Sequence, residues 1–210
     1  MKYALQLLAI ALAGAQTCFS QSLLDAPTAI RELKKGTLLV RLPSAQSRIQ
    51  ALQQVGRHEQ AAEVLRQYAE KNQLIVAAFT KHFCFCPFLF FYSDATPLLL
   101  QGQRRGFFLN DSLEVDTSLT IHTDFFLIVT IGRPVMYGTD KGRRSGAPPQ
   151  PGLFGEVFVV HDSQLNQMTA PFPFSAREDF ITYLTGGNWE KKVIALNRRL
   201  EAYYQMVQQP

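Results

Sequence analysis

The feature that most constrains this chain is an unbroken apolar run at residues 83–92, followed by the turn-favouring Ser93. The run is rich in aromatic side chains and contains Cys84 and Cys86. A short continuous apolar run that stops at a turn signal is typical of a strand buried on both faces, which occurs where a sheet is covered on both sides. We therefore predict a central strand at residues 85–92.

Three further β-favouring runs lie at residues 38–42, 125–131 and 157–161. Between and around them the apolar residues recur at steps of three and four, which is typical of amphipathic helices, most clearly from His58 onwards and after Asn188. Strands that alternate with helices favour the α/β class. The sequence predicts a mixed sheet of about five strands, with these runs at its centre and helices on both faces.

Local signals predict several smaller elements. Ser44 or Ser47 is predicted to cap the next helix, and Ser47 and Gln50 have the spacing of a capping box. Polar and apolar residues alternate at residues 113–121, which predicts a second, outer strand. Ser175 and Glu178 form another capping-box pattern, which predicts a helix that closes before Gly186.

Residues 1–20 have the pattern of a secretory signal peptide. Lys2 precedes a short apolar segment, and small residues follow it, so that cleavage after Ala15 or Ser20 fits the pattern. We therefore expect a periplasmic or secreted protein. A lipid anchor on Cys18 is the less favoured alternative, because Gln16 stands where that signal has a small apolar residue. Since no later apolar stretch reaches about 18 residues, we expect no transmembrane segment in the mature chain.

The charge pattern argues against binding to nucleic acid. The chain carries a net charge of +4, which falls to +3 if Lys2 is removed with the signal, and its basic residues are scattered. Residues 21–210 are predicted to form a single α/β domain. Within it, residues 134–153 are rich in glycine and proline and contain Lys141, Arg143 and Arg144, which predicts a flexible basic loop. We favour plain disorder there, with contact to an anion or a partner as the alternative.

The order of the expected elements from residue 37 onwards resembles the thioredoxin fold. In that family the reactive C-x-x-C pair lies where the first core strand meets its helix, and here the matching positions hold Ser44 and Ser47. The family also has a proline just before its third core strand, whereas this chain has no proline at residues 122–124. The resemblance therefore implies the fold without the usual redox site.

His82, Cys84 and Cys86 alternate, so on an extended strand they share one face. Residues two apart on a strand are separated by about 6.6 to 6.8 Å, which is too far for one metal ion with bonds of about 2.0 to 2.3 Å. We expect no metal site and no cofactor. A disulfide between the two cysteines is at the limit of the allowed geometry unless Pro87 bends the chain. We favour a core role for both thiols, with redox chemistry as the alternative.

The sequence contains no complete catalytic set. His161, Asp162 and Ser163 are consecutive, so their side chains point in different directions and do not form a nucleophile–base line. Our leading hypothesis is a non-enzymatic binding or accessory module of the cell envelope, with an unidentified protein or small molecule as partner. The alternative is a thioredoxin-like thiol oxidoreductase or thiol-dependent chaperone that uses Cys84 and Cys86.

Overall fold

The computed structural model describes residues 25–136, 150–151, 156–176 and 188–209. Its helices and the one 3-10 turn are α1 (Ala26–Lys35), α2 (Gln46–Gln54), α3 (His58–His82), η1 (Ser93–Ala95), α4 (Thr96–Leu100) and α6 (Trp189–Gln208). Its strands are β1 (Thr37–Leu42), β2 (Phe88–Tyr92), β3 (Phe108–Leu109), β4 (Phe126–Gly132), β5 (Val135–Met136), β6 (Gln150–Pro151), β7 (Val157–His161) and β8 (Ser175–Ala176).

The main sheet has six strands in the order β3-β2-β1-β4-β7-β8. Strand β1 lies between β2 and β4 and runs parallel to both, whereas β3, β7 and β8 are each antiparallel to the strand beside them. The four inner strands are the four apolar runs of the sequence. The prediction of an α/β fold with a mixed sheet built around these runs is therefore confirmed.

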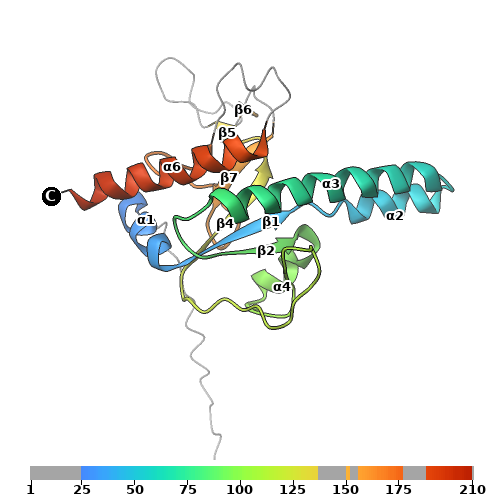
Figure 1. Cartoon of the computed structure of the whole chain (residues 1–210), viewed down its shortest axis with the longest axis horizontal. Coiled ribbons are helices and arrows are strands. Elements are labelled where there is room, and N and C mark those ends of the chain that lie inside the picture. The colour runs from blue at the N-terminus through green and yellow to red at the C-terminus, as the bar shows by residue number, and fades with distance from the viewer. Residues whose placement is uncertain (1–24, 137–149, 152–155, 177–187, 210) are drawn as a thin grey trace, which may run out of the picture.

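The two faces of the sheet are covered differently, because β1 alternates its side chains between them. Leu38, Val40 and Leu42 belong to the larger core, which includes buried residues of α1, α3 and α6. Leu39 belongs to a second core, which is covered by α4 and the segment 101–125. Figure 1 shows α3 and α6 on one side of the sheet and α4 on the other.

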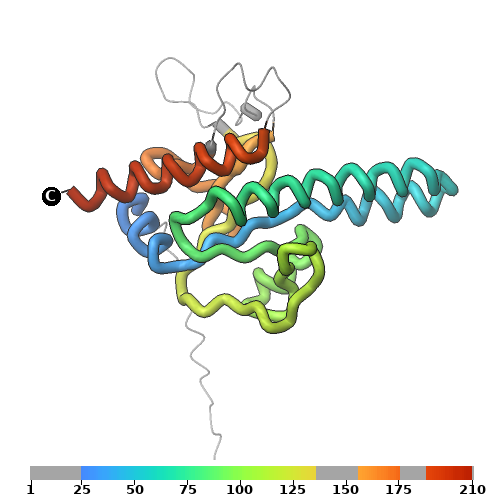
Figure 2. The backbone as a smooth tube through the Cα atoms, viewed as in Figure 1, coloured from blue at the N-terminus to red at the C-terminus, as the bar shows by residue number. Residues whose placement is uncertain are grey.

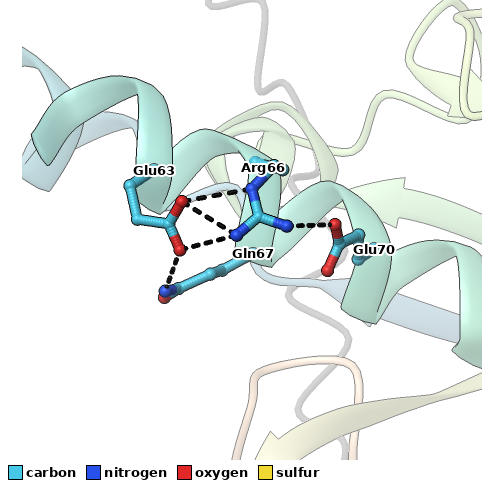
Figure 3. A network of polar contacts seen from close by, with 4 residues as sticks. All are labelled: Glu63, Arg66, Gln67 and Glu70. Carbon is cyan, nitrogen blue, oxygen red and sulfur yellow. Dashed lines mark hydrogen bonds and ion pairs between the residues drawn. The ribbon is translucent and has the colours of Figure 1, made fainter. Parts of the chain in front are cut away.

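Helices α2 and α3 form an antiparallel hairpin that projects beyond the sheet (Figures 1 and 2). Its own small core contains Ile49, Ala61 and Val64. On the outer surface of α3, Arg66 donates to Glu63 and to Glu70, and Gln67 also donates to Glu63 (Figure 3). Because solvent screens these fully exposed charges, the ion pairs contribute little to stability.

The strand predicted at residues 85–92 is shorter than expected. Helix α3 continues to His82, Phe83 ends it, and the chain bends before β2 begins at Phe88. The side chain of Asn197 on α6 holds this bend, since its Oδ1 accepts the backbone N–H groups of Cys84 and Phe85 at 2.9 and 3.0 Å. His82, Cys84 and Cys86 therefore do not lie on one face of a strand.

Two other local predictions are wrong. Residues 113–121 form turns and isolated bridges instead of an outer strand. Helix α2 begins at Gln46 after Ala45 in a left-handed conformation, so Ser47 lies inside the helix and is not its cap. Ser175 belongs to β8, and the rest of the helix predicted there lies outside the described residues.

Among the described residues, no helix is long and apolar enough to cross a membrane. The predicted signal peptide, residues 1–20, lies outside the described part of the chain. The last helix does begin as the sequence predicts. The side chain of Asn188 caps α6 by accepting the backbone N–H of Glu190 at 2.8 Å.

Candidate functional site

The carboxyl ends of the parallel strands β1, β2 and β4 lie at one edge of the sheet. The chain leaves β1 for β2 through α2 and α3, of which α3 covers one face, and then crosses back to β4 through α4 and the segment 101–125, which cover the other. In open α/β sheets, ligands bind outside the carboxyl ends of strands where the connections reverse direction. A ligand site is therefore expected at this edge.

Arg41 is the one charged residue in β1, and the alternation of the strand places it on the face of Leu39. It is half-buried, and its Nε donates a hydrogen bond to Thr96 Oγ1 at 2.8 Å. Thr96 Oγ1 in turn donates to the carbonyl oxygen of Ser93 at 2.6 Å. Burial lowers the pKa of Arg41, and the nearby carboxylate of Asp94 opposes this shift. The guanidinium remains charged at neutral pH because its ordinary pKa is above 12.

The terminal nitrogen atoms of Arg41 are available to a ligand. Within the described residues, the bond from Nε to Thr96 is the only hydrogen bond of this side chain. Neither Nη atom makes a hydrogen bond with a described residue, and Arg41 as a whole is half-buried. A guanidinium held through Nε presents its two remaining amino groups as a fork, which is the geometry that binds a carboxylate or a phosphate.

A second polar cluster joins the ends of β1 and β2. Ser44 Oγ donates to Asp94 Oδ1 at 2.7 Å and lies 3.0 Å from Ser93 Oγ. The backbone N–H of Ser44 also donates to Ser93 Oγ at 3.2 Å. From the opposite face, Asn72 of α3 donates to the carbonyl oxygen of Pro43 at 2.9 Å. These bonds fix the loop that follows β1 and hold the chain beside Arg41 in one geometry.

A groove of about 740 Å³ lies beside Arg41, over the carboxyl half of β4, the adjoining part of β7 and the segment 165–169. Thr130, which lines the groove, is the register partner of Arg41 on the neighbouring strand. The only charged side chain in the described lining is Arg133, and the lining contains no carboxylate. Arg41, Thr130, Arg133, Val159 and His161 define what we call the carboxyl-edge crevice.

His161 lies in the crevice as a neutral imidazole. Its Nδ1–H donates to the carbonyl oxygen of Val159 at 3.0 Å. Burial is the main cause that lowers its pKa, and the positive charge of Arg41 acts in the same direction, against the opposing effects of the Val159 carbonyl and Asp162.

We expect the lowered pKa of His161 to make the fold less stable at mildly acidic pH. Below the ordinary histidine pKa of about 6.5, the unfolded chain binds a proton that the folded chain resists, so the free energy of unfolding falls by at most about 1.4 kcal/mol per pH unit. Urea unfolding of the wild type and of His161→Gln at pH 7.5 and 5.5 measures this. The variant is expected to lose less stability on acidification.

His58 provides the control, because it is exposed at the start of α3. His58→Gln is expected to leave the difference between the two pH values unchanged. If both variants lose as much stability as the wild type on acidification, His161 does not cause the effect.

The two thiols predicted as redox candidates are both free and have different environments. Cys84 is exposed, and its Sγ accepts a weak hydrogen bond from Asn197 Nδ2 at 3.6 Å. Cys86 is buried in the main core, and burial raises its pKa to about 12, against a smaller opposing effect of Lys34. A thiol with such a pKa stays protonated at neutral pH and is a poor nucleophile. The thiol-dependent function stays a prediction, supported by the exposure of Cys84 alone.

The remaining sequence candidates are not brought to the crevice. Lys141, Arg143 and Arg144 lie outside the described residues, as does most of the predicted basic loop, although β5 and β6 at its two ends pair with each other. The described part of the chain holds no cluster of three metal-ligating side chains. Sequence reasoning missed Arg41, although its signal is visible as the one charge within the apolar run of residues 37–42.

Comparisons with protein-family models, with curated proteins and with solved structures found no match for this chain. The function is therefore argued from the geometry of the crevice.

Proposed function

We propose that this protein is an exported, non-enzymatic binding module, and that the carboxyl-edge crevice binds a ligand through an acidic group on that ligand. The observation that carries the proposal is the half-buried guanidinium of Arg41, which is fixed through Nε to Thr96 beside a groove and whose Nη groups bond to no described residue. Export is the part of the proposal supported by the sequence of residues 1–20.

The charges around the groove favour an anion. Arg133 lies in the lining and Arg41 beside it, while the lining itself has no carboxylate. Asp94 lies close enough to Arg41 to raise its pKa, yet the hydrogen bond of the guanidinium goes to Thr96 and not to Asp94. Asp94 is instead held by Ser44, so it leaves the Nη groups of Arg41 unoccupied.

The contacts of the hydroxyl groups support binding rather than catalysis. A serine nucleophile needs an imidazole or another base within hydrogen-bond reach. Ser44 Oγ contacts Ser93 and Asp94, and the ring of His161 hydrogen-bonds to the carbonyl oxygen of Val159. In this part of the described chain the hydroxyl groups therefore organise the loop, and the arginine side chains remain to bind.

We expect an acidic probe to bind at Arg41. Succinate titrated into ¹⁵N-labelled protein is expected to shift the amide signals of Arg41, Thr130 and Arg133 in a saturable manner. A charge-assisted hydrogen bond contributes about 1.5 to 3 kcal/mol, so Arg41→Met is expected to weaken binding at least about tenfold. Arg41→Lys keeps the charge but loses the fork, and is expected to have an intermediate effect.

Arg48→Met is the matched control, because it removes the same charge from a residue that is exposed on α2. It is expected to leave the affinity for succinate within about twofold. Equal losses in the two variants would mean that succinate responds to overall charge, and the crevice would then not be the site. Succinamide, which has the same shape without charge, is expected not to bind.

A further inference from the structure

A second cavity, of about 240 Å³, lies next to the amino end of β4, and its lining shares Asn166, Gln167 and Thr169 with the lining of the groove. Three parts of the chain enclose it: the first turn of α1, the residues from Phe125 to Leu127, and the segment 162–171. Its volume corresponds to about eight water molecules at about 30 Å³ each, which is room for a small ligand. We call it the amino-edge cavity.

The amino-edge cavity has an apolar wall and a negatively charged rim. Ala29, Phe126 and Leu127 are buried residues of its lining, and Met168 packs against the main core beside them. The charged residues of the described lining are Asp25 and Asp162, and the lining includes no lysine, arginine or histidine. Its charge is thus opposite to that of the carboxyl-edge crevice.

The two carboxylates differ in how they are held. Asp162 Oδ1 accepts the backbone N–H groups of Gln164 and Asn166, both at 2.8 Å, so this side chain has a fixed position. Asp25 precedes α1, but its side chain does not cap the helix and makes no hydrogen bond within the described residues. Its carboxylate is therefore free to pair with a ligand.

The amino end of α1 opposes these charges only in part. A helix amino terminus is equivalent to about half a positive charge, and two carboxylates outweigh it. Pro27 also removes one of the N–H groups that would otherwise bind an anion there. The rim thus stays negative, and the apolar wall adds a surface that favours a hydrocarbon group.

We propose that the amino-edge cavity binds a small organic cation, a primary amine on a short alkyl chain. The alkyl chain lies against Ala29, Leu127 and Met168, and the ammonium group pairs with Asp25 at the rim. This site does not depend on the proposed function of the crevice, because it recognises the opposite charge through Asp25 and Asp162, which do not line the groove of the crevice.

The probe is n-butylammonium, titrated into the ¹⁵N-labelled full chain and followed by amide shifts. Saturable shifts are expected at Ala29, Leu127 and Met168. The neutral n-butanol and the anionic butyrate have nearly the same size and are expected to bind at least about fivefold more weakly. Equal binding of all three compounds, or of none, would overturn the proposal.

Asp25→Asn removes the charge with little change in shape and is expected to weaken n-butylammonium about fivefold without changing the affinity for n-butanol. Asp111→Asn is the control, since Asp111 is exposed in the segment 110–118 and does not line the cavity. If the two variants have the same affinity for n-butylammonium, Asp25 does not bind the ammonium group.

A second variant tests the volume of the cavity. Ala26→Leu adds a larger side chain at a half-buried position of the lining and is expected to weaken n-butylammonium and n-butanol alike. Circular dichroism and urea unfolding of this variant report whether the rest of the fold is intact. Unchanged affinity for n-butylammonium with an intact fold would place the binding elsewhere and overturn the proposal.

Discussion

Replacing Phe79 by alanine is expected to lower the free energy of unfolding by about 4 kcal/mol, because removal of a fully buried aromatic ring leaves a cavity. Phe79 lies on α3 and is 0% exposed. Its ring centroid is 5.2 Å from that of Phe158 on β7 and 6.0 Å from that of Phe90 on β2. One side chain thus joins the helix to strands on both sides of β1.

Urea unfolding followed by circular dichroism measures the loss. Leu74→Ala is the control on the same helix, because Leu74 is 60% exposed, and it is expected to change stability by no more than about 0.5 kcal/mol. Phe79→Leu keeps most of the volume and is expected to cost less than Phe79→Ala. Similar losses for Phe79→Ala and Leu74→Ala would contradict the central packing role of this ring.

The sequence predicts the inner strands well because strands that are buried on both faces consist mainly of apolar residues. A strand covered on both faces has no polar alternation, and β1, β4 and β7 are apolar runs between turn signals. The long helices are predicted for a similar reason, since α3 and α6 each bury one face. The order of the strands in the sheet cannot be predicted in this way, because it depends on pairings between distant segments.

The bend before β2 could not be predicted from local pattern. Residues 83–87 are apolar, so strand and helix fit them equally well. The bend depends on Asn197, which is 113 residues from Cys84 along the chain and caps two of its backbone N–H groups. An asparagine within a helix carries no sequence signal of such a distant contact.

The prediction of a strand at residues 113–121 is wrong for a local reason. Asn110 Oδ1 accepts the backbone N–H groups of Ser112 and Glu114, and Asp116 Oδ1 accepts that of Ser118. Such side-chain bonds compete with a strand ladder. Polar and apolar residue types do alternate here, but the backbone N–H groups that a strand would pair with its neighbour donate to the turn-forming side chains instead.

The candidate site was only partly visible in the sequence. Arg41 is recognisable as a charge inside a buried strand, and buried charges mark positions that need a reason. What it faces is not recognisable, because Thr96, Thr130 and His161 come to it from three separate elements. For the two thiols the sequence signal is stronger than the structural one. Their alternate spacing is conspicuous in the sequence, but in the fold Cys84 is exposed and Cys86 is buried.

Gly36→Ala is expected to lower the free energy of unfolding by about 3 kcal/mol, at the upper end of what overpacking costs. Gly36 links α1 to β1, and its φ of −91° is accessible to any residue, so the expected loss comes from crowding and not from backbone strain. A Cβ at this position would lie 2.5 Å from the carbonyl oxygen of Phe125 and 2.9 Å from that of Glu32. Both are backbone atoms, which cannot rotate away as a side chain does.

The carbonyl group that lies close to Gly36 also takes part in the pairing of β1 with β4. The carbonyl of Phe125 accepts the N–H of Thr37 at 3.1 Å, so any displacement that relieves the clash also disturbs the first pairing of β1 with β4. Gly132→Ala is the matched control, because a Cβ there meets no atom within 4 Å, and it is expected to change stability by no more than about 0.5 kcal/mol. Equal unfolding midpoints for the two variants would show that α1 can move away from the sheet, and the amino-edge cavity between them would then not have a fixed shape.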